Sequence, residues 1–203
     1  MIKLYDSKLS GNAWKVRLLL RHLGIPFERV TLNLAEGTHK SPEFSTRNPF
    51  QRIPVVELGD GSHLCESGAI LLYFGEQTSL LPSDPVDRAG VTAWLFYDQG
   101  DLSRFLAYPR FFAMIGQTEK QAALISQYKA IGEPALVPLE KALSDRPWLA
   151  GAQLSVADFA LYPYIKLAPQ GGYDLTGLPA IQAWLLRFEA LPAYEPLVPE
   201  TQS

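Results

Sequence analysis

Two serines in this 203-residue chain precede predicted helices, where hydroxyl and backbone donors can hold an anion. Ser10 follows an alternating run at residues 2–5 and comes just before a helical run that starts near Trp14. Ser67 opens a second helical run. A hydroxyl beside a helix N-terminus can favour a neighbouring negative charge. Serine is also a preferred N-cap, so the residue types leave both roles open for Ser10. Ser7 is a second candidate donor in the same loop.

Other side-chain chemistry is limited by composition. Cys65 is the only cysteine, so neither an intramolecular disulfide nor a Cys-x-x-Cys redox pair can form. Cys65 lies in an apolar strand-like run, where a free cysteine is usually buried. With three histidines and no Cys/His cluster, we expect no metal site. The net charge of −3 is too balanced for a nucleic-acid-binding protein.

The elements that must position these residues alternate in type up to residue 79. Strands are predicted at residues 2–5, 27–34, 53–58 and 62–65, and helices at residues 14–23, from 41 and at 67–75. Gly24 and Pro26 end the first helix, and Pro42 occupies a first helical position. Pro54 stands at the head of its strand, because proline cannot donate to a sheet ladder. The first half of the chain is therefore predicted to be an α/β domain.

The second half is predicted to be all-helical and begins after a loop at residues 80–85, which contains two prolines. Helical runs are predicted at residues 86–107, 119–144, 156–167 and 179–190. Ser155 and Asp158 form the acidic variant of a capping box, flanked by Leu154 and Phe159 as a hydrophobic staple. We interpret this motif as a folding device and not as a catalytic site.

Hydropathy gives no sign of a membrane protein. No run approaches the ~20 apolar residues that span a bilayer. The first six residues lack the basic and apolar regions of a secretory signal. A cytoplasmic location with no membrane partner is therefore expected.

Four stretches of the chain, in their order and spacing, resemble the cytosolic glutathione S-transferases. They are residues 10–17 (SGNAWKVR), 48–54 (NPFQRIP), 66–70 (ESGAI) and 147–158 (PWLAGAQLSVAD). The resemblance is to the serine-type members of this family, and within them to bacterial proteins that are similar to the theta, zeta and delta classes. It implies a thioredoxin-like glutathione-binding domain at residues 1–79. An all-helical domain at residues 86–203 would then form the second-substrate pocket.

The resemblance implies that the chemistry is ionisation of the glutathione thiol. A free cysteine thiol has a pKa of ~8.5 and is mostly protonated at pH 7. Ser10 aligns with the catalytic serine of these classes, and Asn12 is a candidate second donor, with loop formation as its alternative role. Tyr5 stands where a tyrosine-type enzyme carries its donor, but the strand pattern favours a core aromatic.

Glutathione binding is assigned by the same resemblance to residues in three loops and one helix. They are His39, Gln51, Arg52, Ile53, Pro54, Glu66, Ser67 and Asp101. Ile53, before a cis Pro54, would pair its backbone with the extended tripeptide. Ser67 would hold the γ-glutamyl carboxylate at a helix start, and Glu66 would meet the α-amino group.

The remaining assignments have equally ordinary explanations. His39 and Gln51, with Lys40 and Arg52 beside them, match positions that hold the glycyl carboxylate, although each is also a plausible solvated loop residue. Asp101 would reach glutathione across a dimer or be a surface acid.

The expected partners are glutathione as co-substrate, a hydrophobic electrophile and a second copy of the chain. Phe50, in a polar loop, is the predicted anchor of a homodimer, with folding onto its own domain as the alternative. Aromatic residues of the second half are candidates for the electrophile pocket: Tyr97, Phe105, Tyr108, Phe111 and Phe112.

Three functions compete at this point. The first is a glutathione transferase acting on an electrophilic carbon. The second is a glutathione-dependent disulfide reductase or peroxidase. The third is a non-catalytic binding protein on the same fold, which would be expected to lose Ser10 or the Glu66-Ser67 pair, and this chain keeps both.

Overall fold

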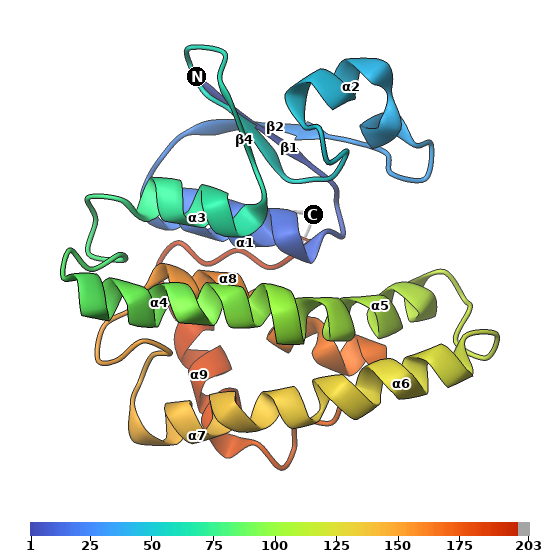
Figure 1. Cartoon of the computed structure of the whole chain (residues 1–203), viewed down its shortest axis with the longest axis vertical. Coiled ribbons are helices and arrows are strands. Elements are labelled where there is room, and N and C mark those ends of the chain that lie inside the picture. Colours follow the sequence, from blue (N-terminus) through green and yellow to red (C-terminus); the bar gives the residue numbers. More distant parts are fainter. Residues whose placement is uncertain (199–203) are drawn as a thin grey trace, which may run out of the picture. The chain divides into compact units, whose positions relative to one another are not determined.

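The computed structural model describes residues 1–198, which fall into two compact units (Figure 1). One unit contains residues 1–76 and the segment from Leu191 on, and the other contains residues 77–190. The boundary precedes the predicted loop because Leu80 and Leu81 are buried and Val156 N donates a hydrogen bond to Leu80 O at 3.0 Å. Among residues 1–198, no helix is long and apolar enough to cross a membrane.

The first unit is built on a four-stranded mixed sheet in the order β2-β1-β3-β4. The strands are β1 (Ile2–Asp6), β2 (Phe27–Thr31), β3 (Val55–Glu57) and β4 (His63–Cys65). β1 runs parallel to β2 and antiparallel to β3, and β3 runs antiparallel to β4. Together with the helices on both faces, this arrangement confirms the predicted thioredoxin-like fold.

Three α-helices cover the two faces of this sheet (Figure 1). They are α1 (Gly11–His22), α2 (Pro42–Arg47) and α3 (Ser67–Gly75), with a 3₁₀ turn, η1 (Thr38–Lys40), before α2. Leu4 and Val56 pack against Val16 and Leu20 of α1 and Ile70 of α3. The neighbouring residues in the strands face the other way, and Tyr5 and Val55 pack against Phe44 of α2. This alternation is the period-two pattern from which the strands were predicted.

The second unit is helical, as predicted, but contains more helices than the sequence pattern indicated. They are α4 (Pro85–Tyr97), α5 (Ser103–Met114), α6 (Ala122–Gly132), α7 (Val137–Asp145), α8 (Val156–Leu167) and α9 (Pro179–Glu189). The predicted run 86–107 is interrupted by a π-helical turn, η2 (Asp98–Leu102). The run 119–144 is divided by a 3₁₀ turn, η3 (Pro134–Leu136), because proline cannot donate in a continuous helix. A further 3₁₀ turn, η4 (Ala168–Gly171), follows α8.

The predicted capping box at the start of α8 is confirmed. Ser155 Oγ accepts from Ala157 N at 3.3 Å, and Asp158 Oδ2 accepts from Ser155 N at 2.9 Å. Asp158 is fully buried, and its Oδ1 accepts from Leu149 N and Trp184 Nε1, each at 3.0 Å. The motif therefore fixes α8, the loop before it and α9 at one point.

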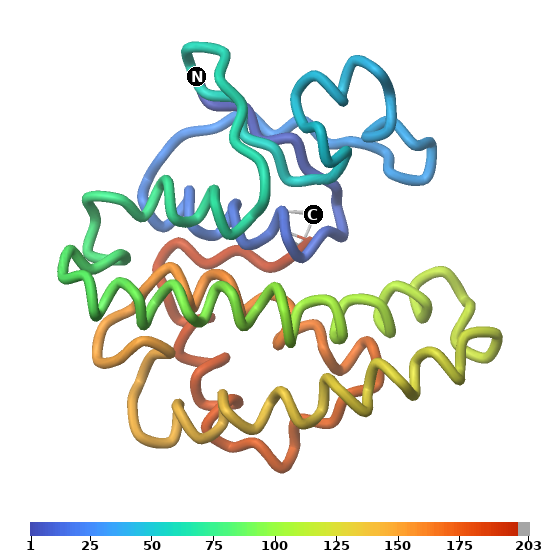
Figure 2. The backbone as a smooth tube through the Cα atoms, in the orientation of Figure 1, coloured from blue at the N-terminus to red at the C-terminus, as the bar shows by residue number. Residues whose placement is uncertain are grey.

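Residues 191–198, the C-terminal strap, belong to the first unit and pack on α1 (Figure 2). Trp14 Nε1 donates to Glu195 O at 2.8 Å, and Arg17 Nη2 donates to Leu197 O at 2.9 Å. The family resemblance placed these residues in the second domain (86–203), whereas their contacts group them with the first unit. Two carbonyl groups of the strap, those of Glu195 and Leu197, accept from side-chain donors of α1.

Candidate functional site

The strand register brings three loops to one edge of the sheet. Val55 pairs with Tyr5 on one side and with Cys65 on the other. β1 and β4 both end near this edge, whereas β3 begins there. The loop after β1, the Ile53-Pro54 peptide before β3 and the Glu66-Ser67 pair after β4 consequently lie at the same edge.

Two helix N-termini meet at this edge. α1 begins at Gly11 and α3 begins at Ser67, and Ser67 Oγ donates to Asn12 Oδ1 at 3.4 Å. The first turns of both helices carry backbone N–H groups without helical partners and a partial positive charge. Their convergence makes this edge a site for an anion.

Ser10 is the N-cap of α1, and its Oγ accepts from Ala13 N at 3.2 Å. The helix therefore begins three residues before the predicted start at Trp14. A serine hydroxyl has two acceptor positions and one donor, so the cap leaves the O–H available to a ligand. Ser10 can therefore cap the helix and act as a catalytic donor at the same time. Ser7 O accepts from Ser10 N at 3.1 Å, which places both candidate serines in one turn.

Glu66 precedes α3 in a backbone conformation that non-glycine residues seldom adopt, with φ 65° and ψ 121°. Its side chain is exposed, while the neighbouring Ser67 is 4% exposed. Such conformations cost of order 1–3 kcal/mol and concentrate at functional sites. Glu66 thus places an exposed carboxylate directly before the N-terminus of α3.

The Ile53-Pro54 peptide bond is cis, which confirms that prediction. Pro54 is buried, and Ile53 packs partly against the cluster of Tyr5, Phe44 and Val55. The peptide is therefore held by the domain core at the edge where the helix N-termini meet.

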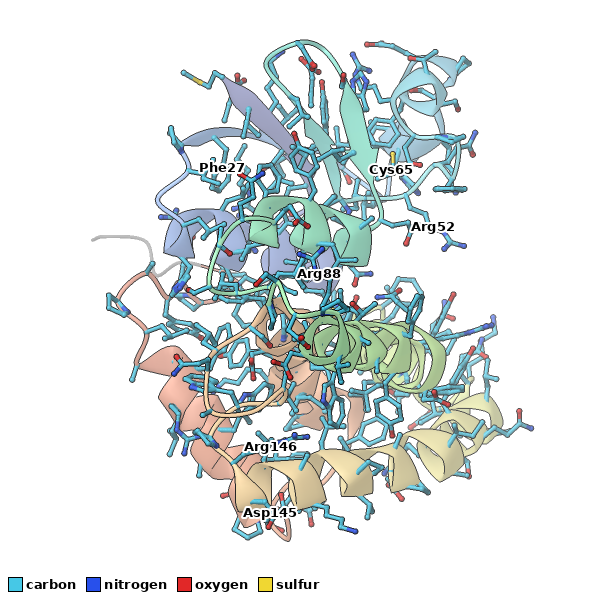
Figure 3. All side chains as sticks on the ribbon, turned by 60° about the vertical axis from the view of Figure 1, so that its left-hand side comes forward. Phe27, Arg52, Cys65, Arg88, Asp145 and Arg146 are labelled. Atoms are coloured by element: carbon cyan, nitrogen blue, oxygen red, sulfur yellow. The ribbon has the colours of Figure 1, made fainter. Side chains whose placement is uncertain are left out.

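The predicted carboxylate-binding residues lie in η1 and in the loop after α2. Lys40 Nζ donates to Gln51 O at 3.2 Å, and Gln51 Nε2 donates to Ser45 Oγ at 2.8 Å. The Gln51 amide is thus directed at its own domain. Burial, followed by the nearby Lys40 charge, lowers the pKa of His39. Arg52 is exposed and extends outward from the loop (Figure 3).

Tyr5 and Cys65 have structural roles, as predicted. Tyr5 is 7% exposed, and its hydroxyl donates to Glu57 Oε2 at 2.7 Å. Burial and this hydrogen bond raise the pKa of Tyr5. Cys65 packs partly against the Tyr5 cluster (Figure 3), and its thiol donates to Arg47 O at 3.4 Å. Burial and the Glu66 charge raise the pKa of Cys65, which disfavours a reactive thiolate.

The second unit presents part of the predicted aromatic set on its surface. Tyr108 and Phe111 are 42% and 49% exposed, whereas the Tyr97 hydroxyl donates to Ala135 O at 2.8 Å. Tyr128 of α6, which no sequence pattern singled out, stacks its ring on that of Tyr108 with centroids 5.3 Å apart. Only packing of α5 on α6 reveals this pair. Asp101 is exposed in η2 of the same unit.

Two family models match the chain: "Glutathione S-transferase, N-terminal domain" over residues 1–76 and "Glutathione S-transferase, C-terminal domain" over residues 103–192. The disulfide-bond oxidoreductase YfcG of Escherichia coli is 32% identical, with 95% of this chain and 92% of that protein covered.

Two solved structures are also closely similar. A glutathione S-transferase from Pseudomonas fluorescens has a TM-score of 0.94 at 37% identity, with 97% of this chain and 98% of that chain covered. Ure2p, a yeast prion protein, in complex with glutathione has a TM-score of 0.86 at 25% identity, with 95% of each chain covered.

Proposed function

Because the chain belongs to the glutathione S-transferase family, we propose that it binds glutathione and directs its thiolate at an electrophilic, apolar second substrate. The observation that carries this proposal is the meeting of the α1 and α3 N-termini, where Ser67 Oγ lies 3.4 Å from Asn12 Oδ1. Backbone donors of two helices and the Ser10 hydroxyl can then hold the anionic groups of one glutathione molecule.

The proposed chemistry begins with loss of the thiol proton to solvent. The Ser10 O–H donates to the sulfur, and the α1 N-terminus stabilises the charge. Asn12 can supply a further N–H donor, because Ser67 engages only its amide oxygen. The thiolate attacks the electrophilic carbon, a carbon–sulfur bond forms, and the leaving group departs with its electron pair. The protein contributes the thiolate population and its orientation.

The rest of the tripeptide is placed by the same edge of the sheet. The Ile53 backbone would pair with the cysteinyl backbone in the manner of an added strand. Ser67 and its backbone N–H would hold the γ-glutamyl carboxylate, and Glu66 would pair with the α-amino group. His39, Lys40 and Arg52 are the available cations and donors for the glycyl carboxylate.

A second candidate, glutathione-dependent disulfide reduction, is supported by the similarity to YfcG. One glutathione thiolate attacks a disulfide sulfur, which gives a mixed disulfide and releases one thiolate. A second glutathione thiolate resolves the mixed disulfide, so that oxidised glutathione forms and the second thiol leaves. The same Ser10 site would serve both reactions.

Three measurements test these candidates together. Retention on immobilised glutathione tests binding, turnover of a chlorinated aromatic tests transfer, and reduction of 2-hydroxyethyl disulfide tests exchange. We expect retention and measurable transfer. Retention with neither activity would favour the non-catalytic binding protein, and absence of retention would contradict the proposal.

Cys65→Ala is expected to leave disulfide reduction within about twofold of the parent, because a half-buried thiol with a raised pKa is a poor nucleophile. The assay is the reduction of 2-hydroxyethyl disulfide with glutathione. A loss of this activity in a folded Cys65→Ala variant would show that the protein's own thiol takes part.

Homodimerisation through Phe50 also belongs to the proposal. Phe50 is 58% exposed, so it does not fold into its own domain, and its N–H donates to Asn48 Oδ1 at 2.9 Å. Buried Asn48 also binds Arg52 O through Nδ2 at 2.7 Å. The loop is thereby fixed in a form that displays the ring.

Phe50→Ala is expected to raise the dimer dissociation constant about 30-fold, which corresponds to ~2 kcal/mol for an aromatic anchor. Sedimentation equilibrium measures this constant. Leu186→Ala is the control, because Leu186 is a large apolar residue of α9 that is 69% exposed. Equal effects of the two substitutions would argue against a specific anchor.

A further inference from the structure

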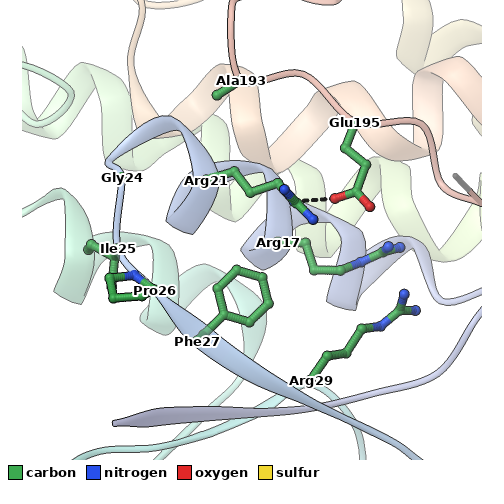
Figure 4. Close-up of a pocket in the computed structure, with 9 residues that line it drawn as sticks. All are labelled: Arg17, Arg21, Gly24, Ile25, Pro26, Phe27, Arg29, Ala193 and Glu195. Carbon is green, nitrogen blue, oxygen red and sulfur yellow. Dashed lines mark ion pairs between the residues drawn. The ribbon is translucent and has the colours of Figure 1, made fainter.

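A cavity of about 470 Å³ lies in the first unit between α1, the beginning of β2 and the C-terminal strap (Figure 4). Its lining includes Arg17 and Arg21 of α1, Ile25, Phe27 and Arg29 from the β2 region, and Glu195 of the strap. Phe27 pairs with Ile2 at the beginning of β1, whereas the candidate glutathione site lies at the end of β1. The cavity is therefore a separate feature of this unit.

The charges around the cavity are unequal. Arg21 forms an ion pair with Glu195. Asp6 Oδ2 lies 3.2 Å from Arg17 Nε and 2.5 Å from Arg29 Nε, so one carboxylate is shared by two guanidinium groups. Among the described residues of this cluster, three arginines face two carboxylates, which leaves one positive charge.

Arg17 is the buried arginine of this group of charges. Arg17 is only 1% exposed, and one of its terminal nitrogens, Nη2, donates to Leu197 O at 2.9 Å. The other, Nη1, is buried and has no hydrogen-bond partner within residues 1–198. Burial lowers the pKa of Arg17, and the adjacent Arg29 lowers it further, although Asp6 opposes both effects. Buried charged donors are normally paired, so an acceptor is expected here.

The remaining wall of the cavity is apolar. Ile25, Pro26 and Phe27 form it, and Arg17 and Arg29 extend in the same direction from α1 and β2 (Figure 4). A guanidinium group is a planar donor that matches a carboxylate, as the Arg21–Glu195 pair on the same wall illustrates. The volume falls within the ~300–1,000 Å³ of small-molecule sites.

We propose that this cavity binds a small organic monocarboxylate with an apolar body. The carboxylate pairs with Arg17 and Arg29, which matches the single excess positive charge. The apolar body rests on Ile25, Pro26 and Phe27. Glu195 pairs with Arg21 on the same wall, and its negative charge also acts on Arg17, so it weakens the positive field at the site.

Phenylacetate, titrated into the full chain saturated with glutathione, tests this site by ¹H–¹⁵N NMR of the arginine Nε–H groups. The Trp14 indole N–H is a second reporter, because it donates to Glu195 O. We expect Arg17 and Arg29 signals to shift with a dissociation constant near ~1 mM. Phenylacetamide has the same body without the charge and is expected to bind at least about tenfold more weakly.

Two substitutions are expected to change the affinity in opposite directions. Arg29→Gln removes a binding guanidinium and is expected to lower the affinity for phenylacetate at least about tenfold. Glu195→Gln removes a negative charge near Arg17 and is expected to raise this affinity about threefold or more. Arg104→Gln is the control, because Arg104 is an exposed arginine of the second unit. It is expected to leave the affinity unchanged.

Several results would overturn the proposal. They are no shift up to about 10 mM phenylacetate in both the parent and Glu195→Gln, equal affinity for phenylacetamide, and an affinity in folded Arg29→Gln equal to that of the parent. If Arg29→Gln does not fold, the Glu195→Gln comparison decides. Glu200 lies outside the described residues, and a shift of the Arg17 signals in ligand-free Glu200→Gln would assign the acceptor to the chain itself and overturn the proposal.

Discussion

Ser10→Ala is expected to lower turnover of a chlorinated aromatic by roughly tenfold to a hundredfold at neutral pH. Removing a hydrogen bond to a charged group costs ~1.5–3 kcal/mol, and this donor favours the thiolate over the thiol. The apparent thiol pKa in the kcat profile should rise by about one unit or more, since one unit corresponds to ~1.4 kcal/mol. Glutathione affinity should change less than about threefold, because other groups hold the tripeptide.

The control must separate catalysis from capping, because Ser10 Oγ also accepts from Ala13 N. Ser41→Ala removes an equivalent cap: Ser41 Oγ accepts from Phe44 N at 3.1 Å at the start of α2. Each substitution should cost ~1 kcal/mol of stability, but only Ser10→Ala should change the pH profile. An unchanged profile in Ser10→Ala, with activity lost in Ser7→Ala, would transfer the catalytic role to Ser7.

Asp158→Ala is expected to lower the free energy of unfolding of the second unit by ~3–5 kcal/mol. The carboxylate is fully buried and accepts from Leu149 N, Ser155 N and Trp184 Nε1. Its removal leaves these donors buried without an acceptor, which costs more than the bonds themselves contribute. Guanidinium unfolding followed by tryptophan fluorescence measures the loss as a lower midpoint.

Asp174→Ala provides the matched control. Asp174 accepts from Thr176 N at 2.8 Å in an exposed turn, so its loss should cost less than ~1 kcal/mol. Comparable midpoints for the two variants would show that buried Asp158 is dispensable and that the staple residues alone fix the start of α8.

The two proposed activities make different demands on the same edge of the sheet. Both need the thiolate at Ser10, but transfer also needs an apolar surface for the electrophile. In the second unit, Tyr108 and Phe111 are exposed aromatic residues, and Tyr108 stacks on Tyr128. Disulfide exchange places no comparable demand on the second substrate.

Local features of the sequence were sufficient for several predictions. The Ser155–Asp158 box and the strand alternation that buries Tyr5 were predicted because caps and pleats depend on residues close together in the chain. The cis Pro54 was predicted from the family resemblance of its motif. By contrast, periodicity missed the breaks at η2 and η3, since an apolar stripe continues across a short irregular turn.

Only the tertiary structure decided which distant groups meet. No sequence pattern placed Asn12 against Ser67. None placed the C-terminal strap on Trp14 and Arg17, either, because that contact joins residues about 180 positions apart. The excess charge beside Arg17 likewise arises only when α1, β1 and β2 bring Arg17 and Arg29 to the single carboxylate of Asp6. The sequence determined the elements and their caps, and the packing of those elements decided where their charges are left without a partner.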